Sequence, residues 1–412
     1  MAGAYGTRFP LAVWALTRAA LLLCVFKVVT PPGPDVTSDV SVIYQGWYEV
    51  LKTGTYPLDD VTWQYPPAAA LAIVSPAVLP FLGYASAFFV LAFLCDAVIL
   101  GLLLRAGRGG GRSPRGAWVW VVGVPLLGPT SYARYDLMVT AVAVAALLAG
   151  AARPRLMGAL AGFGALLKVW PVLLLVGVER GRATRRSWTA AAVSAVALVV
   201  ACYAAMPGAL AFLAFQRDRG TEIESLGALV FQVARHFGWE GSVLLNYGSV
   251  EFVGPYVQLV SRAALGLTAL AFGWLLVWRL RVREFTAGSL CDAAFTAVAL
   301  FTTTSRVISP QYMLWLVGLA AAALTVRASR MALPAVLVLV ATAVTLLEFP
   351  LLFDRVVAGE PVGIALLVVR NGSLVAASLI ACRRLWRETV SGPRAAGQVS
   401  PAVGADTRAT AR

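Results

Sequence analysis

Charged residues are scarce in this chain. Asp, Glu, Lys and Arg together make up 13% of its 412 residues, whereas hydrophobic residues make up 59%, and the mean hydropathy is +0.78. A soluble domain contains about 25% charged and about 45–50% apolar residues. The composition therefore excludes a soluble globular protein, a disordered chain and a fibrous protein, because none of these keeps so much apolar surface out of water. It predicts a polytopic membrane protein.

Histidine is scarce, and cysteines at metal-binding or disulfide-like spacing are lacking. His236 is the only histidine, and no two cysteines form a CxxC motif. The cysteines all lie in apolar runs, at Cys24, Cys95, Cys202, Cys291 and Cys382. A disulfide framework and a zinc site are therefore not expected. The sequence also lacks a Walker-type phosphate loop and a GxGxxG motif, so we expect no nucleotide site, no metal and no other cofactor.

Positive charge is in excess: 34 Lys and Arg residues against 20 Asp and Glu residues give a net charge of +14. In a soluble protein this excess would suggest a nucleic-acid partner, but no basic patch interleaved with aromatic residues stands on a soluble module. We therefore predict no nucleic-acid binding. Cytoplasmic loops of membrane proteins collect Lys and Arg, which explains the excess by topology.

Apolar runs of membrane-spanning length recur along the whole chain. The predicted crossings are residues 10–29, 84–105, 116–130, 136–151, 187–206, 255–278, 286–304, 311–326, 331–349 and 362–382. No small-residue cleavage site follows the first run, so we interpret it as a retained helix. The stretches 67–80 and 156–178 are apolar but irregular, and the second is interrupted at Lys168-Val169-Trp170-Pro171, where proline disfavours a continuous helix. The prediction is an all-α membrane protein with about ten to twelve transmembrane or re-entrant helices.

The loops between these crossings alternate in charge. Arginine clusters lie within residues 105–115, 153–155, 180–186, 279–283, 327–330 and 383–387, whereas 30–66, 131–135, 207–254, 305–310 and 350–361 are mixed or acidic. This alternation predicts that both termini are cytoplasmic and that the long loops 30–66 and 207–254 lie outside. Residues 1–387 would form one transmembrane domain, and the polar tail 388–412 is expected to be a disordered cytoplasmic segment. Because long ordered loops are usually functional, we expect any chemistry on the outer face.

One carboxylate stands out in the first outer loop. Asp39 follows the first crossing and precedes Tyr44, Trp47 and Tyr48 at helical spacing. A carboxylate at a membrane–water boundary tends to have a raised pKa and can act as a general base. The alternative is a helix N-cap, with the aromatic residues forming an interfacial belt.

Three arginines fall in the predicted outer loops: Arg134, Arg219 and Arg306. A guanidinium group suits a phosphate, although each could instead pair with an Asp or extend to the interface. Charged residues inside the predicted crossings are costly and are also site candidates, unless they lie near helix ends and reach the interface. They are Arg18, Lys27, Asp96, Lys168, Asp292, Glu348 and Arg370.

Taken together, several short motifs resemble glycosyltransferase family 87, whose members are integral membrane enzymes of the GT-C type. The motifs are Ser38-Asp39 with Tyr44; Gly54, Tyr56-Pro57 and Tyr65-Pro66-Pro67; Arg134-Tyr135-Asp136; Leu167-Lys168-Val169-Trp170-Pro171; Arg219-Gly220 with Ile223-Glu224-Ser225; Ser309-Pro310-Gln311-Tyr312; and Arg370-Asn371. Their order and spacing extend the resemblance over about residues 10–385. The resemblance implies a GT-C-like helical bundle.

The family resemblance also implies a reaction. Family members that use polyprenol-phosphate-mannose take the sugar from a lipid phosphate on the non-cytoplasmic face, without a nucleotide. By resemblance, Asp39 would be the catalytic base. We expect Arg134, Arg219 and Arg306 to contact the donor phosphate, and we assign substrate contacts to Tyr44, Tyr65, Gln311 and Glu224. The expected partners are a polyprenyl-phosphate donor with mannose as its expected sugar, a lipid or glycan acceptor of the cell envelope, and the lipids of the plasma membrane.

Two other functions stay open. A transporter or flippase of lipid-linked sugars would also need charges within a bundle. It should have a substrate route across the midplane and often an internal repeat. The sequence has no convincing internal repeat, and its polar motifs fall on one face. A non-catalytic binder of lipid-linked glycans is the second alternative. The residues Ser309-Pro310-Gln311-Tyr312 replace a histidine-containing motif of the mannosyltransferases, so the acceptor and the linkage are left open.

Overall fold

The computed structural model describes residues 2–213 and 220–392 and is almost entirely helical. Its first half contains α1 (Ala2–Val25), η1 (Asp39–Tyr44), α2 (Gln45–Leu51), α3 (Ala69–Val74), η2 (Ser75–Val78), α4 (Tyr84–Ala106), α5 (Arg115–Leu126), η3 (Gly128–Ser131), α6 (Asp136–Gly150), α7 (Pro154–Leu167), η4 (Trp170–Gly177) and α8 (Arg182–Ala205). Its second half contains β1 (Thr221–Glu222), α10 (Ala228–Ala234), η5 (Arg235–Phe237), β2 (Ser242–Asn246), β3 (Ser249–Val253), α11 (Val257–Arg281), α12 (Ser289–Thr304), α13 (Tyr312–Leu324), α14 (Ala332–Leu346), η6 (Leu347–Leu351), α15 (Phe353–Ala358) and α16 (Pro361–Thr389).

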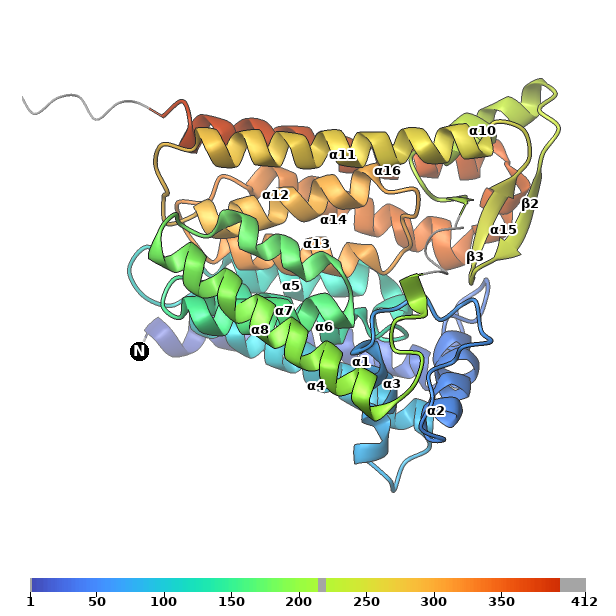
Figure 1. The fold of residues 1–412 in the computed structure, drawn as a ribbon, viewed down its shortest axis with the longest axis horizontal. Coiled ribbons are helices and arrows are strands. Elements are labelled where there is room, and N and C mark those ends of the chain that lie inside the picture. The colour runs from blue at the N-terminus through green and yellow to red at the C-terminus, as the bar shows by residue number, and fades with distance from the viewer. Residues whose placement is uncertain (1, 214–219, 393–412) are drawn as a thin grey trace, which may run out of the picture.

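Six described helices are long and apolar enough to cross a membrane, and they confirm the predicted fold class. They are Arg8–Val25, Tyr84–Ala106, Arg182–Ala205, Val257–Arg281, Ala332–Leu351 and Pro361–Thr389. Shorter apolar helices, among them α6, α7, α12 and α13, lie between the long ones (Figure 1). All residues of α13 after Tyr312 are buried, so its length is set by protein neighbours and not by the thickness of the lipid layer.

Several boundaries differ from the predicted ones by a few residues. Helix α1 ends at Val25, and Lys27 has a positive φ of 60°. The expected crossing 116–130 is divided into α5 and the 3-10 turn η3. The predicted interruption at Lys168 is confirmed, since α7 ends at Leu167, Lys168 is extended, and η4 starts with Pro171 in its first turn. Helix α16 continues to Thr389, two residues into the predicted tail, and residues 393–412 lie outside the described part.

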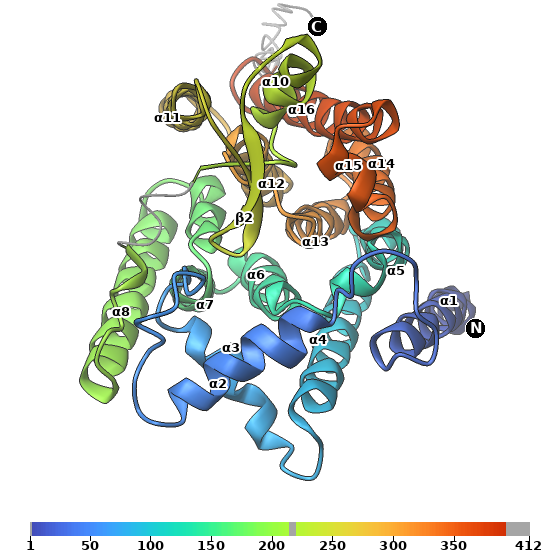
Figure 2. The ribbon, with the colours of Figure 1, turned by 90° about the vertical axis from the view of Figure 1, so that its right-hand side faces the viewer.

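The arginine-rich loops gather at one end of the bundle, called here the arginine end. The loop after α4 meets the end of α13 where Ser113 N donates to Thr325 O, and the loop after α11 meets the end of α16 where Arg283 N donates to Thr389 O. The opposite end, called here the loop end, carries residues 26–83, the β-strands and α15 (Figures 1 and 2). The helices between the two ends form the main hydrophobic core.

A small antiparallel sheet covers part of the loop end. Its strand order is β1-β3-β2, with Thr221 opposite Phe252 and Val243 also opposite Phe252. Phe252 packs with Phe231 of α10 in a second, smaller hydrophobic cluster that also includes Leu367 of α16. This cluster fixes the chain around β1 above the helices, which positions Glu222 and Glu224 at the bundle's mouth.

Candidate active site

Asp39 begins η1 at the loop end and forms an ion pair with Arg134. Arg134 Nη2 lies 2.8 Å from Asp39 Oδ2, and Arg134 Nη1 donates to the carbonyl oxygens of Val36 and Ala133. The Asp39 side chain is 32% exposed and that of Arg134 only 9%. A buried guanidinium group therefore holds a carboxylate that a substrate can still reach. Asp39 is the first residue of η1 and not its N-cap, and Ser38, which occupies the N-cap position, makes no side-chain cap hydrogen bond.

Electrostatics keep Arg134 charged despite its burial. Burial by itself would lower its pKa, but Asp39 and the neighbouring Tyr44 and Tyr65 raise it above the usual value. The guanidinium group therefore remains available to hold a carboxylate or a phosphate.

Three tyrosines lie beside this pair, of which Tyr44 and Tyr135 are buried and Tyr65 is half-buried. The ring centroid of Tyr135 lies 5.9 Å from that of Tyr44 and 5.2 Å from that of Tyr65. Burial raises the pKa of Tyr44 well above its usual range, so its hydroxyl stays protonated and can donate a hydrogen bond. Tyr44 and Tyr65, both predicted substrate contacts, thus form one aromatic wall with Tyr135, a residue that the predicted contacts did not include.

Lys168 lies in the short extended segment between helices α7 and η4, next to the wall formed by these tyrosines. Its Nζ lies 2.7 Å from Asp136 Oδ1 and between 5.0 and 5.4 Å from four ring centroids. The rings are those of Tyr65, Tyr135, Tyr312 and Trp315. Trp315 Nε1 also donates to Asp136 Oδ1 at 2.7 Å. The sequence marked Lys168 as a costly intramembrane charge, but nothing in the pattern identified Asp136 as its partner.

A second polar cluster joins β1 to α16. Glu222 accepts hydrogen bonds from Ile308 N at 2.6 Å and Ser309 Oγ at 2.9 Å. Arg370 lies 3.1 Å from Glu348 Oε1 and donates to the carbonyl oxygens of Glu224 and Ile308. These bonds tie two loops that are about eighty residues apart, 222–224 and 308–309, to a single buried guanidinium group.

Glu224 lies within this cluster and within the electrostatic reach of Arg134. Burial raises the pKa of Glu224 well above its usual range, Glu222 and Glu348 raise it further, and Arg370 and Arg134 lower it. Its Oε1 is 4.0 Å from Arg370 Nη2. The two clusters therefore act on each other, and the raised pKa favours the neutral form of Glu224, which can donate a proton or a hydrogen bond.

The remaining predicted residues are placed as follows. Arg306 is half-buried, its carbonyl oxygen accepts from Glu222 N at 3.1 Å, and its Nη1 lies 3.5 Å from Ser261 Oγ. Gln311 directly precedes α13, beside Tyr312, whose ring stacks on Trp315 at 3.9 Å. Arg219 lies outside the described residues. In the part of the chain that the structure describes, no group of three or more His, Cys, Asp or Glu side chains could hold a metal ion.

The arrangement combines an accessible carboxylate, buried cations and a wall of tyrosines at one end of a membrane bundle. Such a set can accept a proton at Asp39, stabilise an anion and hold a polar ring. Comparison with known proteins agrees with this chemistry. No curated protein and no solved structure matches the chain significantly, but the model of the family described as Glycosyltransferase family 87 matches residues 63–310. Asp39 and Tyr44 precede this range and Arg370 follows it. Since the matched range covers more than half of the sequence, the chain belongs to glycosyltransferase family 87.

Proposed function

We propose that this membrane glycosyltransferase transfers a hexose, specifically mannose, from a polyprenyl-phosphate donor to a lipid-linked or envelope glycan acceptor. The observation that carries the proposal is the Asp39–Arg134 ion pair, which places a reachable carboxylate against a buried cation. The tyrosine wall beside it can pack against a sugar ring. An acceptor hydroxyl and a donor phosphate each find a suitable partner in this site.

The reaction is a single displacement. The acceptor oxygen forms a bond to the anomeric carbon of the sugar, the bond from that carbon to the phosphate oxygen breaks, and polyprenyl phosphate leaves with the electron pair. Asp39 accepts the proton of the acceptor hydroxyl, a role that contributes about 10²–10⁴-fold in rate. The leaving phosphate is already an anion, so it needs electrostatic stabilisation more than a strong acid.

Cations at the loop end would supply that stabilisation. Arg134 already bonds Asp39 through Nη2, so in our proposal it holds the base and faces the phosphate with the rest of its charge. Arg306 and Arg219 would complete the phosphate site. Tyr44, Tyr65, Gln311 and Glu224 would contact the sugar or the acceptor, with the neutral carboxyl of Glu224 as a hydrogen-bond donor.

The experiment uses the full chain in membrane vesicles with radiolabelled polyprenyl-phosphate-mannose and extracted envelope lipids. We expect label to move to an acceptor lipid and free polyprenyl phosphate to form in equal amount. Nucleotide-linked mannose should not replace the donor. Donor that crosses the bilayer unchanged, with no labelled product, would instead identify a transporter, and binding without product would identify a non-catalytic binder.

We also propose that the loop end lies outside the cell and that both termini are cytoplasmic, in the plasma membrane. The arginine clusters at the opposite end support this orientation. In a variant without the five native cysteines, Thr53→Cys should react with an impermeant reagent on intact cells and Gly110→Cys should not, since both positions are exposed in the fold. The reverse labelling would contradict the orientation and, with it, the outer-face reaction.

A further inference from the structure

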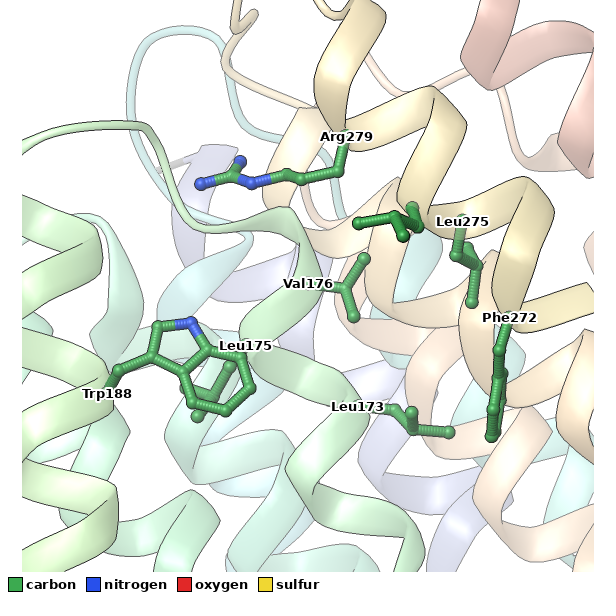
Figure 3. A pocket seen from close by; sticks show the side chains of 8 residues that line it. Leu173, Leu175, Val176, Trp188, Phe272, Leu275 and Arg279 are labelled. Carbon is green, nitrogen blue, oxygen red and sulfur yellow. The ribbon is translucent and has the colours of Figure 1, made fainter. Parts of the chain in front are cut away.

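An apolar groove opens on the flank of the bundle, far from the candidate active site. It encloses about 330 Å³ between η4, α8 and α11. Figure 3 shows Leu173 and Val176 of η4, Trp188 of α8 and Phe272 of α11 around it, with the Arg279 guanidinium group above. A groove with apolar walls and one cation at its rim is shaped for an amphipathic molecule.

The helices around this groove face lipid. Most of the membrane-spanning parts of α8 and α11 is exposed, and the exposed residues include Val193, Val196 and Leu270. A hydrocarbon chain can therefore enter the groove sideways from the bilayer. A soluble anion would gain nothing from these walls, because their contribution comes from apolar contact.

Arg279 lines the rim of the groove, and the guanidinium group of Arg180 contacts the Arg279 backbone. Arg279 Nη2 donates to Thr184 Oγ1 at 2.8 Å, and its guanidinium carbon lies 5.0 Å from the ring centroid of Phe285. Arg279 Nη1 is buried and has no acceptor among the described residues. Arg180 donates to the backbone oxygen of Arg279, so the two like charges are neighbours. Within the described residues neither arginine forms an ion pair with a carboxylate, and a phosphate would relieve their repulsion.

We propose that this groove binds one anionic phospholipid of the leaflet at the arginine end. Its headgroup phosphate lies against Arg180 and Arg279, and one acyl chain fills the groove between Leu173 and Phe272. Charge complementarity selects an anionic over a zwitterionic lipid, because two unpaired cations favour a net negative headgroup. The occupant is not the sugar donor, since Arg279 is at the far end of α11, a helix about 37 Å long, from the active site.

The test measures lipid retention by native mass spectrometry on the full chain. The protein is released from nanodiscs that contain equal amounts of dioleoyl phosphatidylglycerol and dioleoyl phosphatidylcholine. We expect one phosphatidylglycerol molecule to stay bound, and Arg180→Gln/Arg279→Gln to weaken its retention by about tenfold or more. Leu276 of α11 also lines the groove, so Leu276→Trp, which fills the groove and leaves both arginines in place, should also release the lipid. This second variant tests the groove even if the double variant does not fold.

Matched controls separate this site from general basicity. Arg281→Gln, an exposed arginine at the same end of α11, should leave retention unchanged. A neighbouring cavity is lined by Arg155, Arg185 and Arg186, and loss of the lipid only in Arg185→Gln/Arg186→Gln would place it there and overturn the proposal. Full competition by inorganic phosphate would also overturn it, because the acyl chain would then contribute nothing. Equal retention of both lipids would contradict the charge selection.

Discussion

Two ion pairs with the same separation stand toward opposite ends of this bundle. Arg370 Nε lies 3.1 Å from Glu348 Oε1 near the loop end, and both side chains are fully buried. Arg330 Nε lies 3.1 Å from Glu388 Oε1 at the arginine end, where the side chains are 63% and 42% exposed. Distance is therefore no guide to what an arginine does in this protein. Burial decides how much an ion pair contributes to stability, because a buried charge depends on its partner and an exposed charge is solvated by water.

The same contrast extends to the whole of each end. At the loop end Arg134 and Arg370 are buried and bond to carboxylates and backbone oxygens of several loops. At the arginine end Arg327 is exposed and Arg384 is half-buried, and each donates to a single carbonyl oxygen. Arg134 and Arg370 are thus buried and connect several loops at one end, whereas Arg327 and Arg384 each hold a single backbone carbonyl at the other.

Breaking the buried pair should produce the largest effect. Arg370→Met leaves Glu348 without a counter-charge and removes donors from two carbonyl oxygens, which should cost about 3–5 kcal/mol of folding free energy. Denaturation in mixed detergent micelles measures the loss. Arg370→Met/Glu348→Leu should recover part of it, because no charge is then left buried alone. A single variant as stable as the wild type would show that water reaches this pair.

Asp39→Asn should come next, and its effect should be on turnover instead of stability. Asparagine keeps the shape and can still accept from Arg134, but it cannot take a proton, so kcat should fall by at least about a hundredfold. The mannosyl-transfer assay in vesicles measures it. Asp35→Asn is the matched control in the same loop, since Asp35 is paired with Lys27 and the backbone of Thr37. Loss in the control with normal turnover in Asp39→Asn would move the base to another carboxylate.

The sequence predicted the architecture better than the site. Apolar length and proline position determine where helices lie and break, which is why the interruption at Lys168 and the arginine end could be foreseen. Which residues pair with the charged side chains could not be foreseen. Lys168 meets Asp136 across 32 residues, and Arg370 meets the Glu224 carbonyl across 146. Hydropathy describes an element's environment but not the direction in which one of its side chains points.

Substituting the loop-end arginines by lysine sharpens the comparison of roles. Lysine keeps the charge but loses the planar fork. Arg306→Lys should raise the donor KM severalfold and Arg306→Ala by about tenfold, with kcat little changed. Arg134→Lys should also lower kcat, because Arg134 holds Asp39. Arg384→Lys at the other end is the control. An unchanged donor KM in all loop-end variants would make these arginines structural anchors only.

Glu224 allows the loop end to be tested by pH. Its pKa is raised by burial in the folded state, so above the ordinary value of 4.5 the unfolded chain releases a proton that the folded chain retains. Stability therefore falls as pH rises from there toward the raised pKa. Glu224→Gln should increase the apparent melting temperature at about pH 8 and leave it nearly unchanged at about pH 5. The exposed Glu240→Gln should show neither effect, and a pH-independent shift in Glu224→Gln would exclude this titration.

The exposed pair at the arginine end should give the smallest effect. Arg330→Gln and Glu388→Gln each break a contact as short as the buried one, yet water replaces the lost partner, so each should change stability by well under about 1 kcal/mol. Raising the salt concentration should remove even this difference, because exposed pairs are screened. A double-mutant cycle in detergent micelles isolates the pair's coupling. Coupling comparable with that of Arg370 and Glu348 would mean that burial does not distinguish the ion pairs of the two ends. The difference between the loop end and the arginine end would then have to rest on the surrounding loops.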